Sequence, residues 1–451
     1  MFYADLQRNI IYIRAIIITQ SEGEIKMKYE INIENEKKYD VIVVGSGPAG
    51  VASAVSAARN GAKVLIIEAL GRLGGISTSG YMSHFTGTVG NKLYHEIIER
   101  AAKLNRFPCD ELKYIDPEML TLTYIEMLKE AGAEILLYTT FCDVIMDGNK
   151  LIGIICHNKS GFCTFFADAI IDASGDGDVA FKCGAEYTKG RESDGKMQPA
   201  TLMFKVGGVD MERAVFPGAF EHLIETEKGE LQALAKEKLP HPAGHALLYK
   251  STIPGIVTCN MTNVTNIDGT DALSLTEAEI VCRSQMLPIV DFLREYVPGY
   301  EKCYIIGSAS LIGIRETRHF RGLHTLNETE IASAYQHEDY VVYDAYFNFD
   351  VHNVDGAGLD KTGSQKHFKQ TKGYTIPYGC LVPEKIDGLL LSGRNISGTH
   401  IAHSNFRAMP ICIGIGEAAG AAAALAVKQN IPLRDVSPKD IQKIIKMEAR
   451  F

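Results

Sequence analysis

The chain has 451 residues, of which 46% are hydrophobic and 22% charged, the composition of an ordinary soluble globular protein. Its 46 basic and 55 acidic residues give a net charge of −9. This balance argues against a nucleic acid or a membrane as the main partner, because phosphate binding needs a dense cationic face. The 42 glycines exceed the usual share of about 7%. Where they gather is the first informative feature.

Residues 1–36 are interpreted as an N-terminal extension. The apolar run Ile10–Thr19 is too short to span a bilayer of about 30 Å, and no small-residue cleavage site follows it. The codons of Glu22–Glu24 can contain a purine-rich ribosome-binding sequence shortly before Met27. By this hypothesis, residues 1–26 are an untranslated leader that the natural protein lacks.

The ten cysteines include no C-x-x-C pair. Their scattered positions predict reduced thiols in a cytoplasmic protein. They also argue against an iron–sulfur cluster in this chain, because such clusters take cysteines at close, repeated spacings. Cys412 has no resolving thiol nearby in the sequence, so we do not expect it to be a redox group. No metal site is predicted.

The first elements read as a βαβ unit. Tyr39–Val44 predicts a buried parallel strand, because neither of its faces is polar. A glycine-rich turn follows, and then an alanine-rich helix that ends near Asn60, with Gly61 at the position that favours a left-handed residue. Lys63–Glu68 predicts a second buried strand.

Two further helices and an antiparallel layer follow. Apolar residues at helical spacing predict a helix over Asn91–Leu104, and Asp116 before a proline predicts the cap of another helix, which Gly132 ends. The turn sequence Asp147–Asn149 is a strong hairpin signal. Together with an alternating strand over Phe162–Ala167, it predicts a three-stranded antiparallel layer on the parallel sheet.

Later segments return to the pattern of the first domain. Ala169–Ala173 is another predicted buried strand, and Gly388–Ser392 reads in the same way. Between them, residues 205–373 show mixed segments without a second βαβ signature. A glycine and alanine helix over Gly414–Leu425 precedes a final amphipathic helix that Ser437 caps.

Three glycines of the first turn have the spacing of a dinucleotide-binding site. Gly45 permits a tight turn, Gly47 lets the backbone approach a pyrophosphate, and Gly50 lets the helix pack closely on the sheet. Glu68, at the end of the next strand, can accept hydrogen bonds from a ribose diol. The alternative is a purely structural glycine turn, which the strand–turn–helix–strand–acid context makes the weaker interpretation.

Three further motifs favour FAD over NAD. These are G-R-L-G-G at 71–75, A-I-I-D-A-S-G-D-G-D at 169–178, and L-L-L-S-G-R-N-I-S at 389–397. With them, the chain resembles the FAD-dependent oxidoreductase family with a glutathione-reductase-type flavin fold. That family also contains the flavin module of heterodisulfide reductase. The resemblance runs from Lys37 onward and is most specific at Gly313–Gly322, Ile376–Pro383 and Gly393–Pro410.

The resemblance implies an α/β fold: a Rossmann-like FAD-binding domain, with a parallel sheet and a three-stranded antiparallel layer, and an inserted α+β substrate domain. The predicted units are an extension over 1–36, a discontinuous FAD-binding domain over 37–204 and 374–430, the inserted domain over 205–373, and a C-terminal helix over 431–451.

The resemblance also implies which residues hold a non-covalent FAD. Asp176 and its glycine neighbours would contact the ribityl or phosphate portion, and the segment after Gly393 would line the flavin. A helix beginning near Gly414 would offer unpaired N–H groups to the negative charge of a reduced flavin. Its alternative role is close packing on another helix. The expected FAD-binding residues are Gly45, Gly47, Pro48, Ala49, Gly50, Glu68, Arg72, Gly74, Gly75, Ser174, Gly175, Asp176, Gly393, Arg394, Met409, Gly414 and Gly416.

Four polar residues are catalytic candidates. His400, His403 and Arg407 stand beside the flavin motif, and Arg315 belongs to the inserted domain. An arginine can hold a substrate carboxylate, and a histidine titrates in the working pH range. Each can instead be a surface residue, a satisfied core residue or half of a salt bridge.

Three functions remain open from the sequence. The first is an enzyme that transfers a hydride between flavin N5 and a small organic substrate held between the two domains. The second is an electron-transfer protein, like the flavin module of heterodisulfide reductase, that passes electrons to iron–sulfur partner proteins. The third is a regulatory or structural protein. The absence of a second G-x-G-x-x-G argues against a separate NAD(P)H domain, and the absence of C-x-x-C argues against thiol–disulfide chemistry.

Overall fold

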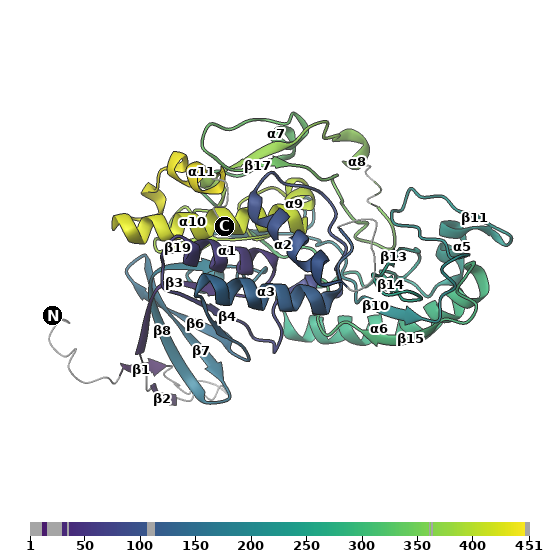
Figure 1. Cartoon of the computed structure of the whole chain (residues 1–451), viewed down its shortest axis with the longest axis horizontal. Helices are drawn as coiled ribbons and strands as arrows, with labels where there is room; N and C mark the ends of the chain where they lie inside the picture. The colour runs from purple at the N-terminus through teal and green to yellow at the C-terminus, as the bar shows by residue number, and fades with distance from the viewer. Residues whose placement is uncertain are drawn as a thin grey trace, which may run out of the picture.

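The computed structural model describes residues 11–15, 29–33, 36–105, 113–359, 361 and 364–446 (Figure 1). In the N-terminal extension, strands β1 (Ile11–Ala15) and β2 (Tyr29–Ile33) pair antiparallel. Most of the leader hypothesis therefore lies outside the described residues and stays a hypothesis.

The predicted βαβ unit is confirmed. It consists of β3 (Glu36–Val44), α1 (Pro48–Arg59) and β4 (Val64–Ile67), and Gly61 has the expected left-handed φ of 93°. Val41–Val44 of β3 pairs in parallel with Val64–Ile67 of β4, and both runs are apolar on both faces, as is typical of parallel strands that helices cover on each side. The whole sheet has the order β5-β4-β3-β8-β7-β6, with β19 beside β8. Its other members are β5 (Glu134–Leu136), β6 (Thr140–Asp147), β7 (Lys150–Asn158), β8 (Gly161–Asp172) and β19 (Leu389–Leu391).

Strand β8 differs from the prediction of two separate strands. The run continues through Asp168 as one strand, since no glycine or proline interrupts it. Its first part pairs antiparallel with β7, and its last residues pair in parallel with β19. The polarity pattern changes along β8 because its neighbours change. The antiparallel strands β6–β8 thus belong to the same sheet as the parallel strands (Figure 1).

The helices beside this sheet are mostly as predicted. Asp116 caps α3 (Pro117–Ala131) by accepting from the amides of Glu118 and Met119, and Gly132 ends it at φ 82°. The other helices of the described chain are α2 (Lys92–Leu104), α4 (Asp178–Lys182), α5 (Leu231–Lys238), α6 (Ala272–Tyr296), α7 (Glu328–Ala332), α8 (Ser364–His367), α9 (His400–Phe406), α10 (Met409–Gln429) and α11 (Pro438–Lys446).

Helix α10 begins earlier than predicted, and its glycines serve packing. It starts at Met409 with a proline in its first turn, which favours a helix start there. A Cβ at Gly416 would lie 2.2 Å from the carbonyl oxygen of Ala49, and one at Gly420 would lie 2.2 Å from that of Ser53. These glycines let α10 contact the backbone of α1. The expectation that Gly414 and Gly416 present free amides is wrong, because both lie inside the helix.

By length and composition α10 could cross a membrane, but 89% of its most apolar window is buried within the protein. Figure 1 shows it lying along α1. We interpret it as the core helix that carries the end of the chain back to the first sheet.

A second group of elements lies on the side of the sheet away from β6–β8 (Figure 1). Its sheet has the order β13-β14-β10-β15. The strands are β10 (Phe204–Gly207), β13 (Leu248–Lys250), β14 (Val257–Cys259) and β15 (Tyr304–Ser308). Further short strands are β9 (Tyr187–Lys189), β11 (Glu225–Thr226), β12 (Gly229–Glu230), β16 (Arg318–Phe320), β17 (Tyr340–Ala345) and β18 (Tyr374–Pro377).

This second group has a core of its own, built from residues between Phe204 and Cys303. By contrast, buried residues between Phe320 and Phe349 pack in the core of the first sheet. The domain boundaries given above stay a prediction. From this distribution of core residues, we propose that the inserted unit ends before Phe320.

Glu417 on α10 makes a testable contribution to stability. Its buried carboxylate accepts from the Leu93 amide at 3.2 Å, and burial raises its pKa to about 7 from 4.5. The folded protein therefore keeps this group protonated at a pH where the unfolded chain ionises it. The stabilising contribution is full below pH 4.5 and is lost as the pH rises through about 7. Between pH 5 and pH 8 this loss amounts to about 2.5 kcal/mol.

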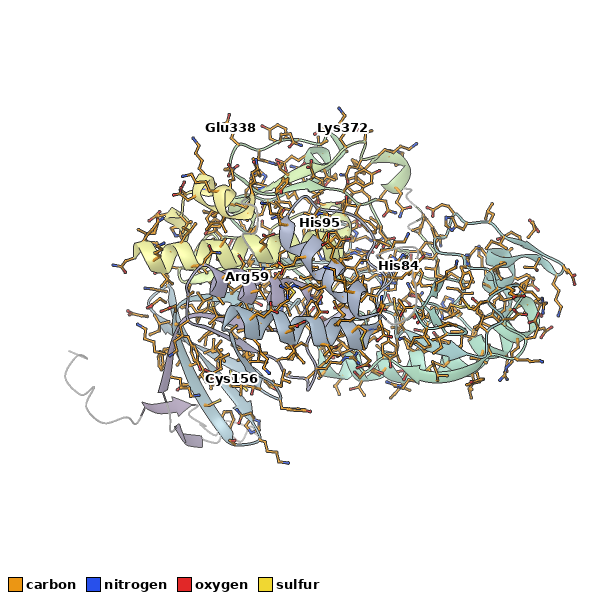
Figure 2. All side chains as sticks on the ribbon, in the orientation of Figure 1. Arg59, His84, His95, Cys156, Glu338 and Lys372 are labelled. Carbon is orange, nitrogen blue, oxygen red and sulfur yellow. The ribbon has the colours of Figure 1, made fainter. Side chains whose placement is uncertain are left out.

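As the pH rises from 5 to 8, the free energy of unfolding of the parent should therefore fall by about 2.5 kcal/mol more than that of Glu417→Gln. Denaturant unfolding at both pH values measures the difference. The same substitution at Glu338, which is exposed on the surface (Figure 2), is the control and should leave the pH dependence unchanged. An equal pH dependence in Glu417→Gln and the parent would contradict the assignment.

Candidate active site

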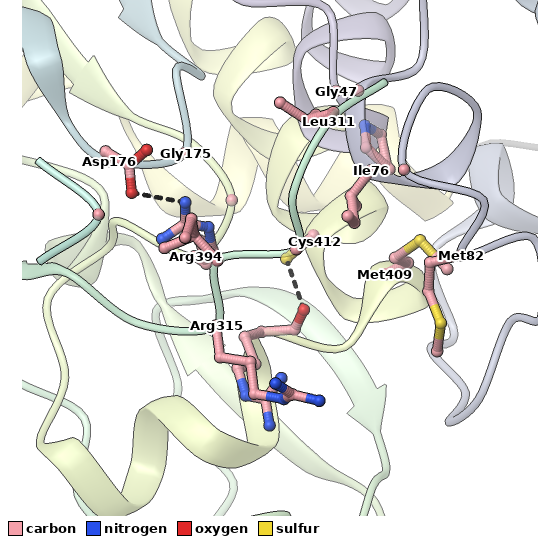
Figure 3. Close-up of a pocket in the computed structure, with 18 of the residues that line it drawn as sticks. Gly47, Ile76, Met82, Gly175, Asp176, Leu311, Arg315, Arg394, Met409 and Cys412 are labelled. Atoms are coloured by element: carbon pink, nitrogen blue, oxygen red, sulfur yellow. Dashed lines mark hydrogen bonds and ion pairs between the residues drawn. The ribbon is translucent and has the colours of Figure 1, made fainter. Parts of the chain in front are cut away.

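A cavity of about 1080 Å³ joins the turn after β3 to the second group of elements. Many predicted site residues line it. They are Gly45, Gly47, Pro48, Ala49, Glu68, Gly75, Ser174, Gly175, Asp176, Gly393, Arg394, Met409, Arg315 and Arg407. Figure 3 shows ten labelled lining residues, among them Gly47, Asp176, Arg394 and Met409, which come from four separate parts of the chain.

The glycines of the turn between β3 and α1 have different structural roles. Gly45 has φ 94°, and a Cβ there would lie 2.6 Å from the Ala173 carbonyl oxygen. A Cβ at Gly50 would lie 2.0 Å from the Gly45 carbonyl oxygen. These two glycines bring strand, helix and neighbouring turn together. Gly47 is different, since an added Cβ would meet nothing within 4 Å and would point into open space.

Glu68 is held in place at the end of β4. Its Oε2 accepts from the Ser46 amide at 3.0 Å and from the Ser46 hydroxyl at 2.6 Å. Its Oε1 accepts from the Leu70 amide at 2.9 Å. An ionised carboxylate has about four lone-pair positions, so Glu68 keeps capacity for a further donor in the cavity.

A second turn closes the cavity from the end of β8. Asp176 Oδ1 accepts from Arg394 Nη2 at 2.6 Å (Figure 3) and from Thr317 Oγ1 at 2.8 Å. Gly175 has φ 84°, and a Cβ there would lie 3.2 Å from the Arg394 guanidinium. These contacts join three segments far apart in the sequence. They include the specific stretches around residues 313–322 and 393–410.

Arg407 and Arg315 occupy another part of the lining. Arg407 Nη2 donates to the Asp350 carbonyl at 2.8 Å and to its carboxylate at 2.9 Å. Asp350 Oδ2 also lies 3.2 Å from His352 Nε2. Arg315 donates from Nη1 to the Pro199 carbonyl at 2.5 Å. The arginines, Asp350 and His352 all face the cavity.

The sequence matches the family model described as FAD dependent oxidoreductase over residues 40–445. The chain belongs to this family. The prediction of an FAD-dependent oxidoreductase with a Rossmann-type flavin fold is therefore confirmed. The protein is an enzyme of the oxidoreductase class, and FAD is its cofactor.

Individual relatives match smaller parts. The chain is 39% identical over 89 residues to glutathione reductase of Schizosaccharomyces pombe, covering 19% of this chain and 18% of that protein. It is 28% identical over 180 residues to thiamine thiazole synthase of Methanococcus vannielii, covering 36% and 66%. The chain thus spans less than two thirds of these relatives. A geranylgeranyl bacteriochlorophyll reductase-like structure from Thermoplasma acidophilum is similar with a TM-score of 0.49 and 14% identity, covering 91% of this chain and 83% of that one.

The cavity of this FAD-dependent oxidoreductase fits its cofactor. Gly47 stands at the N-cap of α1, where the first amides of a helix have no partner within it and favour a phosphate. The open space at its Cα lets a pyrophosphate approach, and Glu68 offers acceptors for a ribose. The link to heterodisulfide reductase and the non-covalent attachment stay predictions.

Five of the residues predicted to bind FAD do not line the cavity. They are Gly50, Arg72, Gly74, Gly414 and Gly416. Arg72 instead donates from Nε to Thr121 Oγ1 at 3.0 Å and pairs with Glu118 at 2.9 Å, both on α3. Its contacts with α3 hold the segment after Glu68 in place. We therefore interpret Arg72 as a residue that supports this segment and not as one that contacts FAD.

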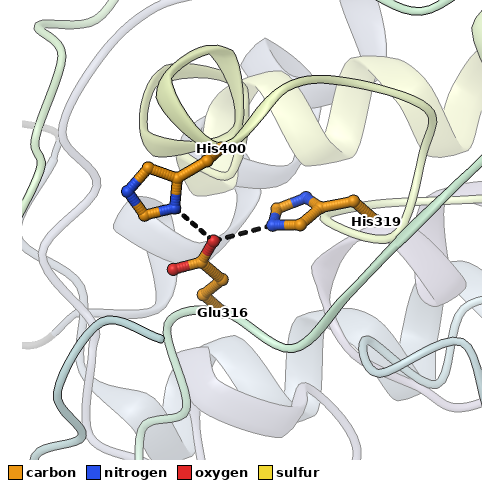
Figure 4. A group of neighbouring side chains, drawn as sticks. All are labelled: Glu316, His319 and His400. Carbon is orange, nitrogen blue, oxygen red and sulfur yellow. Dashed lines mark hydrogen bonds and ion pairs between the residues drawn. The ribbon is translucent and has the colours of Figure 1, made fainter. Parts of the chain in front are cut away.

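Neither of the two predicted histidines, His400 and His403, lines the cavity. Figure 4 shows His400 beside Glu316 and His319. His400 Nδ1 lies 2.5 Å and His319 Nε2 2.7 Å from the same oxygen of buried Glu316. Although burial opposes it, hydrogen bonds from both rings hold the pKa of Glu316 below its usual range. Burial lowers the pKa of His403 well below its usual value, so that ring is neutral. The expectation that His400 and His403 meet substrate is not supported.

Glu316, His319 and His400 are also a candidate metal site, because one ligand atom from each lies within 4.8 Å of the other two. Ligands of one tetrahedral ion stand about 3.3 Å apart. The separations of 2.5 and 2.7 Å are those of hydrogen bonds. We interpret the cluster as a buried link that fixes the segment carrying Arg315.

Several cavity residues were not predicted from the sequence, among them Tyr249, Asn260, Asp350 and His352. Tyr249 and Asn260 belong to the second group of elements and carry no motif. Asp350 and His352 form a D-x-H pattern after an aromatic run, which was a usable signal. Its significance depends on Arg407, 407 − 350 = 57 residues later, and that pairing is visible only in the fold.

Proposed function

We propose that this enzyme transfers a hydride between flavin N5 and a small organic substrate bound in the same cavity. The main support for this proposal is that one continuous cavity reaches from the dinucleotide turn to the second group of elements. Its lining includes the dinucleotide turn at Gly47 and also Leu247 and Asn260 of the second group of elements. When bound, FAD supplies a two-electron donor or acceptor. We assign the part of the cavity lined by the second group of elements to the substrate, because the dinucleotide turn lies in the other part.

The chain's own residues would bind and orient the substrate. Leu247, Met203 and Tyr249 are buried and form an apolar wall that excludes water. Arg315 and Arg407 provide fixed positive charge on the same side. Binding in a defined pose beside the cofactor is the main contribution that such walls make to the rate. Cys412 lies between Gly47 and Arg315 in the view of Figure 3.

Every cysteine in the described part of the chain is a free thiol, which supports our further proposal of a cytoplasmic location. Burial raises the pKa of the Cys412 thiol to about 12. A thiol that stays protonated is a poor nucleophile. This agrees with the expectation that Cys412 has no redox role.

The function is tested by anaerobic reduction of the purified holoenzyme with a metabolite panel of acids, alcohols, amines and amides. We expect bleaching of the flavin by one chemical class without any added protein. Free FAD under the same conditions is the control and should keep its colour. Reduction that requires an iron–sulfur protein, with none by any small molecule, would instead support the electron-transfer alternative.

A further inference from the structure

We propose that the substrate is an organic acid, whose carboxylate binds between Arg315 and Arg407 and whose apolar body lies along Met203, Leu247 and Phe220. This inference rests on the proposed function, because it names the substrate class for the same cavity. It is carried by an excess of buried positive charge, by unpartnered polar atoms and by the apolar wall beside them.

The charge excess distinguishes this part of the lining from the rest. Elsewhere in the cavity each arginine has its own acid: Arg394 pairs with Asp176 at 2.6 Å, and Arg318 pairs with Asp178 at 2.9 Å. Arg315 and Arg407, in contrast, have one carboxylate between them among the described residues, that of Asp350. One positive charge is left for a ligand to balance.

The protonation states preserve this excess near neutral pH. Burial and the nearby Arg407 lower the pKa of Arg315 to about 10, which leaves the guanidinium charged. Although burial opposes it, His352 and Arg407 hold the pKa of Asp350 below its usual range. Burial and the charge of Arg315 lower the pKa of His352 to about 4, so its ring is neutral. The group therefore carries a net charge of one positive unit.

Two of the buried polar atoms in the cavity lining that form no hydrogen bond in the described structure belong to this region. Arg407 Nε is part of the arginine pair, and Thr201 Oγ1 stands on the segment that pairs with Gly313, two residues before Arg315. Buried donors of this kind are nearly always satisfied in folded proteins, by a ligand or by water where no protein atom is available. Both atoms can donate, and a carboxylate has two oxygens that accept. An arginine fork suits such a planar acceptor.

The apolar part of the ligand follows from the neighbouring wall. Met203, Leu247 and Tyr249 form a buried cluster against which Met82 and Phe220 pack. All five residues line the cavity. A wall of this size favours an aliphatic or aromatic body over a second charged group, since burying apolar surface is favourable and burying an unpaired charge is costly.

The cofactor's phosphates are a different possible source of negative charge. Their place is the glycine turn at the start of α1. In the view of Figure 3, Cys412 lies between Gly47 and Arg315. In the described structure Arg315 donates to Pro199 and Arg407 donates to Asp350, rather than to the glycine turn. We therefore assign the arginine pair to the substrate and the glycine turn to the phosphates.

The test compares phenylacetate with phenylacetamide, which match in shape and differ in charge. Calorimetry and visible difference spectra of the holoenzyme measure binding without turnover. We expect the acid to bind at least tenfold more tightly than the amide. Arg315→Gln and Arg407→Gln should each weaken binding of the acid at least tenfold and leave binding of the amide and the FAD content unchanged. Arg213→Gln, at an exposed arginine that pairs with Glu301, is the control.

Removing Arg407 alone leaves the buried Asp350 carboxylate with His352 but without its arginine, which can disturb folding. The double variant Arg407→Gln with Asp350→Asn avoids this. It keeps the positive charge of Arg315 but lacks the fork of Arg407, so it should bind the acid more weakly than the parent, whereas Arg407→Lys should keep part of the binding. Equal binding of acid and amide, or parental binding of the acid by the single and double variants, would overturn the proposal.

The two hypotheses fail in different ways. Acid binding that depends on the arginines, without flavin bleaching by any metabolite, would refute hydride transfer and keep the carboxylate site. Bleaching by neutral compounds only, with no preference for the acid, would refute the carboxylate site and keep hydride transfer.

Discussion

Replacing Gly47 with valine is expected to give a folded protein that has lost its FAD. A Cβ added at this position meets no protein atom within 4 Å, and the backbone conformation, φ −59° and ψ 178°, is open to any residue. The fold therefore tolerates the change. The side chain would occupy the space through which a pyrophosphate reaches the first amides of α1. We expect the purified variant to be colourless, with at least a hundredfold weaker binding of FAD.

Absorbance of the purified protein and titration of the apoprotein with FAD measure this loss, and thermal unfolding of the two apoproteins shows that the fold is kept. Gly307→Val is the matched control. It lies in β15 outside the cavity lining, and its Cβ would meet only the Tyr81 hydroxyl, at 3.5 Å. A yellow Gly47→Val protein with parental FAD content would show that the cofactor does not pass close to this turn.

Replacing Gly416 with alanine is expected to destabilise the protein by about 3 kcal/mol, the upper range for overpacking. The added methyl would lie 2.2 Å from the Ala49 carbonyl oxygen, and backbone atoms can move only if α1 and α10 separate. Alanine gains about 1 kcal/mol over glycine inside a helix, which offsets only part of this effect. Because α1 begins at the FAD turn, its displacement should also lower the affinity for FAD.

Denaturant unfolding of the apoprotein measures the free energy, and Gly414→Ala is the control on the same helix. A Cβ there would approach two buried side chains, Val89 Cγ2 at 2.9 Å and Asn91 Cγ at 3.1 Å, rather than the backbone of α1. Because side chains can shift without separating the two helices, we expect a smaller loss of stability for that variant than for Gly416→Ala, about 1–2 kcal/mol. If both variants were equally stable, close contact between the helix backbones would not be the reason for Gly416.

Local signals were sufficient where a single segment carries the whole pattern. The strand Tyr39–Val44, the cap at Asp116 and the turn at Gly61 were predicted from neighbouring residues and are present in the structure. α10 begins before the glycines that predicted its start, because Pro410 in its first turn is the stronger local signal for a helix start. Gly414 and Gly416 resemble a binding motif in the sequence, but in the fold they contact other helices and loops.

The polar part of the site was less predictable, because its roles depend on partners that are remote in the sequence. His400 and Arg407 looked equivalent as candidates beside the flavin motif. In the fold, His400 turns toward Glu316, while Arg407 meets Asp350 at the cavity. No spacing rule distinguishes them, since the distinction arises from the path of the segments around Glu316 and Asp350.

The pairing of β8 with β19 has a consequence for synthesis on the ribosome. The edge of β8 at residues 170–172 stays open until Leu389–Leu391 has been translated, and the cavity lacks a wall until Met409 follows. An emerging chain that already carries the complete glycine turn thus still lacks part of the lining of the FAD cavity. It also presents an unpaired strand edge, which is a template for aggregation. The full lining of the FAD cavity is therefore in place only once Met409 and Cys412 have been synthesised, so a chain stalled before them cannot hold the cofactor with all of its lining residues.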